Sequence, residues 1–234
     1  MHGEGNARAR ATASGERGLL VCGVIGPALF VAVFLVTSAV HPAGYDPLRH
    51  TVSAFVLGEF GWVQRASFVA SGGLLLAYSV GLRPALRRYG GGRWVPVLIG
   101  LFAIGMIGSG VFAADPVAAG VTTAHPYPLG TPVWPDRTLH GVLHDLFGTP
   151  VFLGLPVACC VVAYRLAAAG HKGWAAYSAG TALAFLTGFV LTAMALAQPP
   201  LIPSIGGLLQ RLTIIIGWAW LAALAAYLIR RTTR

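Results

Sequence analysis

"GLLVCGVIGPALFVAVFLVTSAV", residues 18–40, decides the fold of this chain, because none of its 23 side chains carries a charge. A helix of about 20 apolar residues spans the hydrocarbon core of a bilayer. Five further uncharged runs of comparable length follow it, at 66–82, 94–114, 146–164, 174–197 and 212–229. The sequence therefore predicts an all-α polytopic membrane protein, a bundle of six transmembrane helices with spans at about 18–40, 63–82, 94–114, 142–164, 174–197 and 209–229.

The composition excludes an ordinary soluble domain. Only 10% of the 234 residues are charged, whereas soluble domains carry about a quarter. The lipid bilayer is thus the first partner that the sequence predicts.

The basic residues indicate how the bundle is oriented. Twelve of the 16 Lys and Arg residues fall in 1–17, 83–93, 165–173 and 230–234, all on one side of the predicted bundle. Basic connections stay in the cytoplasm, so both termini are expected there. The positive charge is then a topology signal, and no nucleic-acid partner is expected. Residues 1–17, polar and rich in Gly and Ala, are predicted to be a disordered cytoplasmic tail.

The opposite, outer side collects the groups that titrate or bind metals. Five of the seven acidic residues and five of the seven histidines lie in the connections 41–65, 115–145 and 198–211. Histidine and carboxylate side chains are the usual proton carriers and metal ligands of proteins. We therefore expect a candidate site on this face.

The first outer connection begins "HPAGYDPLRHTVSAF", residues 41–55. Asp46 followed by Pro47 is typical of a helix start. If a helix begins there, the spacing places Asp46, Arg49, His50 and Ser53 on one face. Two interpretations remain open: a capped interfacial helix, or a segment that directs His50 and Ser53 into a site.

"DRTLHGVLHD", residues 136–145, is the densest charged stretch. On a helix, His140 and His144 lie one turn apart on one face, the spacing at which two imidazoles can hold one metal ion. The simpler interpretation is a pair of interfacial histidines with nearby carboxylates such as Asp145. If the histidines form one site, removing either should remove its function.

Three further residues stand at the predicted helix ends. Asp115 closes the third span, where the helix dipole disfavours a carboxylate, so it needs water or a charge partner. Arg65 and Arg211 open the second and sixth spans. They either extend to the headgroups or pair with Asp115 and Asp145, and we expect the pairing.

The stretches "GYDPLRHTVSAF", "GWVQRASF", "FAADP", "LHGVLHDLFGTPVF" and "GLLQRLTIIIGWAW" together resemble a bacterial membrane family, catalogued as domain of unknown function 998. The resemblance covers residues 18–230 and implies a multi-pass protein of the bacterial inner membrane. In that family an acidic residue commonly follows the serine, where this chain has Ala54. A looser likeness, to ceramidase and adiponectin-receptor type membrane hydrolases, implies a serine, an aspartate and three histidines around zinc.

Two functions of different classes follow. The first is a binding, transport or envelope-assembly protein whose outer His/Asp/Arg cluster recognises a headgroup or partner. The second is a metal-dependent hydrolase, with zinc as the candidate metal, acting on a lipid or envelope substrate. In it His50, or His41 in its place, would bind the metal with His140 and His144. The catalytic candidates are Ser53, Asp115 and Asp145, with Arg65, Arg211 and Asp46 as charge partners.

Overall fold

The chain is seen here as a computed structural model. It describes residues 2–40, 42–87, 92–116, 127–132, 135–197 and 205–232, with side chains from Ser14 to Arg231.

Six helices long and apolar enough to cross a membrane confirm the predicted all-α fold. Their bounds are α1 His2–Ala39, α2 Gly61–Arg87, α3 Trp94–Val111, α4 Leu139–Ala168, α5 Lys172–Leu196 and α6 Gly206–Thr232, with a short 3₁₀ helix η1 at Ser53–Leu57 between α1 and α2. Every backbone polar group in a bilayer must find a partner inside the protein. Long helices meet this demand along their length and leave only their ends open.

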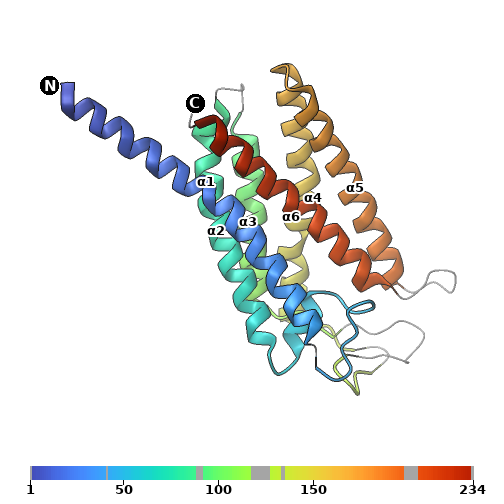
Figure 1. Cartoon of the computed structure of the whole chain (residues 1–234). Helices are drawn as coiled ribbons and strands as arrows, with labels where there is room; N and C mark the ends of the chain where they lie inside the picture. The colour runs from blue at the N-terminus through green and yellow to red at the C-terminus, as the bar shows by residue number, and fades with distance from the viewer. Residues whose placement is uncertain are drawn as a thin grey trace.

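The six helices form a closed ring in chain order. Each packs against its neighbours in the sequence, and α6 completes the ring by packing against α1. Figure 1 shows α6 crossing the bundle beside α1, with the N- and C-terminal ends on the same side. We call that side the terminal end, and we call the side that holds 42–60, 112–116, 127–132 and 135–138 the loop end.

Aromatic side chains fill the axis of the ring. Trp218 of α6 stacks on Phe30 of α1 with ring centroids 5.5 Å apart, and it meets Phe102 of α3 at 5.0 Å. On the α4–α5 side a Cβ on Gly217 would lie within 2.6 Å of both Leu155 and Phe185. Glycine at this position lets α6 approach these two helices closely.

Two helix starts differ from the sequence-based expectation. The backbone of α1 is helical from His2, although residues 1–17 are predicted to be a disordered tail. Figure 1 shows these turns leaving the bundle, so local helix propensity rather than tertiary packing forms them. Helix α4 starts at Leu139, before the expected 142, because the Thr138 side chain accepts the N–H of Gly141 and caps it.

Glycines on α3 allow close contact with α4. A Cβ on Gly108 would lie 2.1 Å from Phe147, whereas a Cβ on Gly100 of the same helix would meet its nearest neighbour, Ser79, at 3.5 Å. The first position has no room for a methyl group, and the second makes an ordinary contact.

We predict that Gly108→Ala lowers the free energy of unfolding by about 1–3 kcal/mol, because overpacking pushes α3 away from α4. Gly100→Ala is the matched control, and it should be neutral or stabilising by up to about 1 kcal/mol because alanine favours the helix. Thermal unfolding of both variants in detergent measures the difference. Equal effects would mean that α3 and α4 do not approach this closely.

Candidate functional site

A cavity of about 610 Å³ opens at the loop end of the ring. Charged and polar side chains form its rim, and apolar side chains of α4 and α5 form one wall. Its lining includes Ser53, Asp115, Arg137, His144, Asp145, Gly148, Phe152, Phe189, Leu196 and Gln210. The cavity therefore joins a charged mouth to the interior of the bundle.

A smaller chamber of about 50 Å³ continues from this cavity toward the axis of the ring. Both spaces share Ser53, His144, Gly148, Phe152 and Gln210. The chamber ends among Phe30, Met106 and Trp218. Trp218 is 1% exposed, and its Nε1–H has no hydrogen-bond partner among the described residues. A buried donor without a partner is costly, and this one belongs to a side chain that lines the chamber.

His144 lies where the two spaces meet and is 7% exposed. Its Nδ1 is 3.0 Å from the carbonyl oxygens of both Ser109 and Phe112. A carbonyl only accepts hydrogen bonds, so the proton must be on Nδ1. In the neutral ring Nε2 then carries the lone pair, and the imidazole can accept a hydrogen bond there.

Arg65, like His144, donates hydrogen bonds to backbone carbonyls at the C-terminal end of α3. Its Nε donates to the Gly110 carbonyl at 3.0 Å, and its Nη2 donates to the Val111 carbonyl at 2.7 Å. The last carbonyls of a helix have no partner inside it, and the C-terminal end of the dipole favours a cation. Arg65 and His144 thus satisfy the carbonyls of residues 109–112. The expected pairing of Arg65 with Asp115 is not what the structure has.

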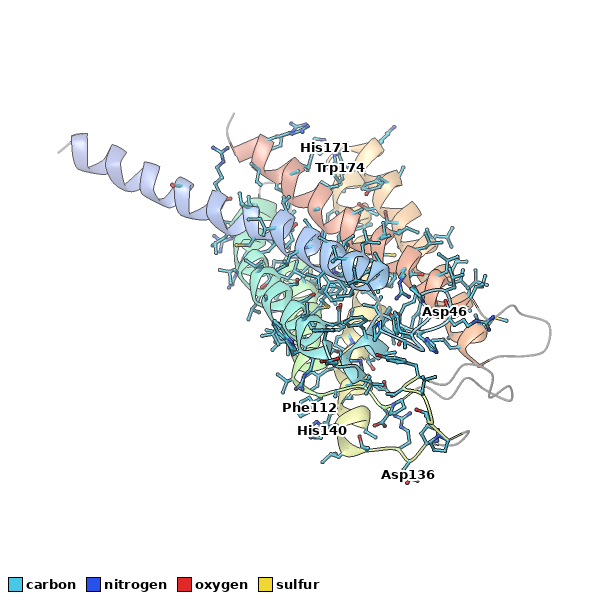
Figure 2. The ribbon with its side chains drawn as sticks, turned by 60° about the horizontal axis from the view of Figure 1, so that its bottom comes forward. Asp46, Phe112, Asp136, His140, His171 and Trp174 are labelled. Carbon is cyan, nitrogen blue, oxygen red and sulfur yellow. The ribbon has the colours of Figure 1, made fainter. Side chains whose placement is uncertain are left out.

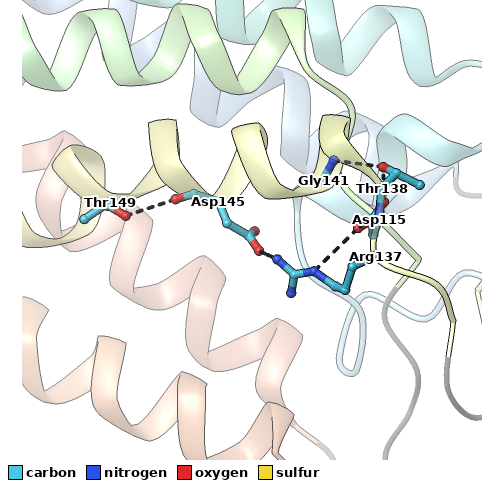
Figure 3. A network of polar contacts seen from close by, with 6 residues as sticks. All are labelled: Asp115, Arg137, Thr138, Gly141, Asp145 and Thr149. Atoms are coloured by element: carbon cyan, nitrogen blue, oxygen red, sulfur yellow. Dashed lines mark hydrogen bonds and ion pairs between the residues drawn. The ribbon is translucent and has the colours of Figure 1, made fainter.

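Asp115 instead extends from the end of α3 to the start of α4. Its carboxylate accepts the Thr138 hydroxyl at 2.6 Å and the Thr138 backbone N–H at 3.0 Å (Figure 3). A Cβ on Gly141 would overlap this carboxylate at 2.0 Å. The positive end of a helix dipole, at the helix start, favours an anion. The start of α4 therefore offsets the unfavourable interaction between the Asp115 carboxylate and the C-terminal end of α3.

Arg137 is the cation that pairs with the rim carboxylates. Its Nη2 donates to Asp145 at 2.7 Å, and its Nε lies 3.7 Å from Asp115 (Figure 3). The guanidinium is largely exposed, so screening by water keeps this contribution to stability small. The rim holds two carboxylates and one arginine.

Arg211 holds the connection between α1 and α2 against α6. It is 6% exposed. Its Nη1 donates to the carbonyls of Pro47, His50 and Gly207 at 2.7, 2.8 and 3.0 Å, and its Nε donates to Ser38 at 3.1 Å. The expectation that Arg211 pairs with Asp115 or Asp145 is therefore wrong for this structure. Backbone carbonyls take the guanidinium because the turn at 47–50 would otherwise leave them without donors.

Tyr45 receives the remaining interaction of this guanidinium. Arg211 Nη2 donates to the Tyr45 hydroxyl, which in turn donates to the Thr51 carbonyl at 2.9 Å. Burial raises the pKa of Tyr45 above its usual value, despite the opposing charge of Arg211. The hydroxyl thus stays protonated and can donate to Thr51.

Residues 46–50 form a single turn, in which the N–H groups of Arg49 and His50 donate to the Asp46 carbonyl, rather than the start of a longer helix. Asp46 accepts the Leu48 N–H and pairs with Arg49, both within 3.0 Å. The Asp46 N–H donates to Nδ1 of His50 at 2.8 Å, so this histidine closes the turn. The chain then enters η1, where Ser53 contacts the Thr51 hydroxyl at 3.1 Å. His50 and Ser53 consequently have separate surroundings.

The structure brings together part of the predicted cluster. Ser53, Asp115, His144 and Asp145 line one cavity. His50 packs instead with the rings of Tyr45 and Tyr127. His140 is exposed, with its ring 5.7 Å from Phe112, and Figure 2 places this pair apart from Asp46 at the loop end. One turn of spacing does not make His140 and His144 share a site, because α3 covers only His144.

Metal binding has no complete ligand set among the described side chains. Within that part of the chain, no group of three His, Cys, Asp or Glu residues could hold an ion. His41 and His125 lie outside the described residues. The predicted set of His50, His140 and His144 is not assembled.

Gln210 and Trp218 were missed by reasoning from the sequence. Gln210 Oε1 accepts the Val52 N–H at 2.8 Å, which leaves its Nε2 as a donor at the cavity. An amide in an apolar run next to Arg211 is the signal that could have pointed to it. Nothing in the local sequence distinguishes Trp218 from the other tryptophans, because only packing places it at the end of the chamber.

We predict that His144→Ala lowers the free energy of unfolding by about 1–3 kcal/mol, because carbonyls of Ser109 and Phe112 lose their donor. His140→Ala, one turn away and exposed, should change it by less than about 0.5 kcal/mol. Thermal unfolding in detergent compares the two. Losses of equal size would contradict the different surroundings of the two rings.

We also predict that Arg211→Lys destabilises the protein by about 2 kcal/mol or more. A single ammonium cannot reproduce the fan of donors that a guanidinium offers. Amide hydrogen exchange should rise across 45–52, where this arginine binds Tyr45 and the carbonyls of Pro47 and His50. Arg49→Lys is the matched control in the same segment, where a partly exposed ion pair contributes less than about 1 kcal/mol. Unchanged exchange in Arg211→Lys would contradict the role of this contact.

Comparison with known proteins places the chain in a family. No curated protein and no solved structure matches it. A family model described as protein of unknown function (DUF998) matches residues 24–227, which include α2 to α5, parts of α1 and α6, and every residue of the cavity. The motifs at the loop end had indicated the same family. The chain is a multi-pass membrane protein that belongs to the DUF998 family.

Proposed function

We propose that this protein is a binding protein of the bacterial inner membrane, with both termini in the cytoplasm, which takes up a small amphipathic molecule from the outer face. The observation that carries the proposal is the position of His144 between the outer cavity and the axial chamber. The carbonyls on Nδ1 leave Nε2 as an acceptor at a chamber whose lining is mostly apolar. A few polar atoms in a largely apolar pocket give orientation and specificity to a ligand.

The size of the chamber supports a polar group as the part that enters it. A volume of about 50 Å³ corresponds to one or two water molecules, each of which occupies about 30 Å³ in the liquid. The polar groups there include Nε2 of His144 as an acceptor and Nε1–H of Trp218 as a donor, beside Ser53, Ser109 and Gln210. A hydroxyl group both donates and accepts, so it would satisfy both atoms.

The walls of the larger cavity support an apolar body for the same ligand. Phe152, Phe189 and Leu196 line the side formed by α4 and α5, opposite the charged rim. A chain of several carbons would bury apolar surface there, at about 25 cal/mol per Å². The ligand class is thus an uncharged amphiphile with a hydroxyl head. The alternative of a metal-dependent hydrolase gains no support from a specific contact among the described residues.

Cysteine accessibility tests the proposal. Gly148 lines both spaces, and a Cβ there would meet no atom within 4 Å. In a chain with Cys22, Cys159 and Cys160 replaced by alanine, Gly148→Cys should react with a membrane-impermeant thiosulfonate added outside intact cells. Gly154→Cys is the matched control on α4, equally free of steric overlap but lining neither space. It should react much more slowly.

Decanol serves as the probe ligand in the same assay. It should slow the reaction of Gly148→Cys several-fold, and His144→Ala should remove this protection. Protection that persists without His144 would mean that decanol only partitions into the bilayer. If Gly148→Cys reacted only from the cytoplasmic side, the proposed orientation would be inverted. If it reacted no faster than Gly154→Cys, the cavity would be closed to the outer water.

A further inference from the structure

A second cavity lies at the other end of the molecule, on the outside of the ring. It is a groove of about 710 Å³ along α4, bounded by Trp94 of α3 and Leu186 of α5. Leu153, Val157 and Tyr164 of α4 lie along it, and each is about half exposed or more. The groove is separate from the candidate site, whose residues open at the loop end.

The groove is apolar along its length and basic at its terminal end. Arg165 is one of its lining residues. The Arg165 guanidinium lies 3.5 Å from the Cβ position of Gly92, and therefore beside the segment that leads into Arg93 and Trp94. Arg93 stacks on the Trp94 ring at 5.2 Å, and Arg165 lies 6.0 Å from the Tyr164 ring. Two guanidinium groups and two aromatic rings thus meet at one end.

No carboxylate of the described side chains neutralises these two arginines. Among the described side chains, neither Arg93 nor Arg165 forms an ion pair. The acidic residues of the sequence at this end are Glu4 and Glu16, both on α1. Helix α1 packs against α2 and α6, away from α4.

The length of the groove matches a lipid chain. Arg165 lies 12 residues after Leu153 on α4, a rise of about 18 Å at 1.5 Å per residue. One leaflet contributes about half of the roughly 30 Å hydrocarbon core. A chain that fills the groove would therefore place its headgroup beside Arg165, where the aromatic rings mark the interface.

We propose that this groove binds one anionic phospholipid of the leaflet at the terminal end, with an acyl chain along α4 and the phosphate between Arg93 and Arg165. Guanidinium groups hold phosphate oxygens by paired, charge-assisted hydrogen bonds. The negative charge of the lipid compensates two arginines that no carboxylate of the described chain neutralises. The site does not depend on the ligand proposed for the loop end.

Native mass spectrometry of the full-length protein in detergent tests the headgroup contact. Phosphatidylglycerol should bind about tenfold more tightly than phosphatidylcholine with the same chains. Arg165→Gln should reduce this preference about five- to tenfold, as expected for the loss of about one favourable charge contact at a membrane surface. Arg87→Gln makes the same change of charge at the end of α2, and it should keep the preference. Equal losses in both variants would overturn the site in favour of a diffuse basic surface.

A second pair of variants tests the groove itself. Val157→Trp should fill it and remove the phosphatidylglycerol adduct, without a change in unfolding temperature because the side chain is about half exposed. Leu183→Trp on α5, also exposed and outside the groove, should leave the adduct in place. An adduct that survives Val157→Trp would overturn the proposal. So would a dimer that Val157→Trp separates, because a second copy would then occupy the groove.

Discussion

Backbone carbonyls at the loop end of this protein must find donors although water is scarce there, and the rest of the structure depends on how they do so. A carbonyl left without a partner inside the membrane costs several kcal/mol. Arg211 supplies donors to Pro47, His50 and Gly207. Arg65 and His144 supply them to the final carbonyls of α3. Many of the polar side chains at the loop end therefore serve as hydrogen-bond donors to backbone carbonyls at helix ends and turns of the same chain.

This closure also forms the cavity. The turn at 47–50 gives carbonyls of Leu48 and Arg49 to the first N–H groups of α6, at 3.0–3.1 Å, while Arg211 binds the carbonyls on either side of them. A Cβ on Gly207 would lie 2.3 Å from the His50 carbonyl oxygen, so the two backbones can meet only at a glycine. The contact places Ser53 and Gln210 at the same opening. The need to pair these backbone carbonyls therefore also produces the cavity at the axis of the ring.

His144 has a part in both the closure and the site. Its Nδ1–H closes α3, and the same bonds fix the orientation of the ring at the boundary of the two spaces. Because backbone groups fix one nitrogen of this side chain, the other nitrogen is presented to a ligand without further loss of conformational freedom.

The polar groups at the terminal end are arranged differently. Arg93 and Arg165 lie beside an apolar groove without a carboxylate, and the lipid surface is the natural source of the missing charge.

The amino-acid sequence alone determined the all-α fold, the six spans and the family, because uncharged runs of spanning length have few alternatives in water or in lipid. It also predicted that Asp115, His140, His144 and Asp145 lie together, with His50 or Ser53 near them, and of these Ser53, Asp115, His144 and Asp145 line one cavity. Only the tertiary structure decided what each polar group does. Helical spacing made His140 equivalent to His144, yet α3 packs over one ring and leaves the other exposed. Counting charges made Arg65 and Arg211 partners for carboxylates, yet helix ends brought carbonyls closer. The reason is physical: sequence spacing tells which residues share a helix face, whereas the neighbour that covers that face is chosen by packing between helices far apart in the chain.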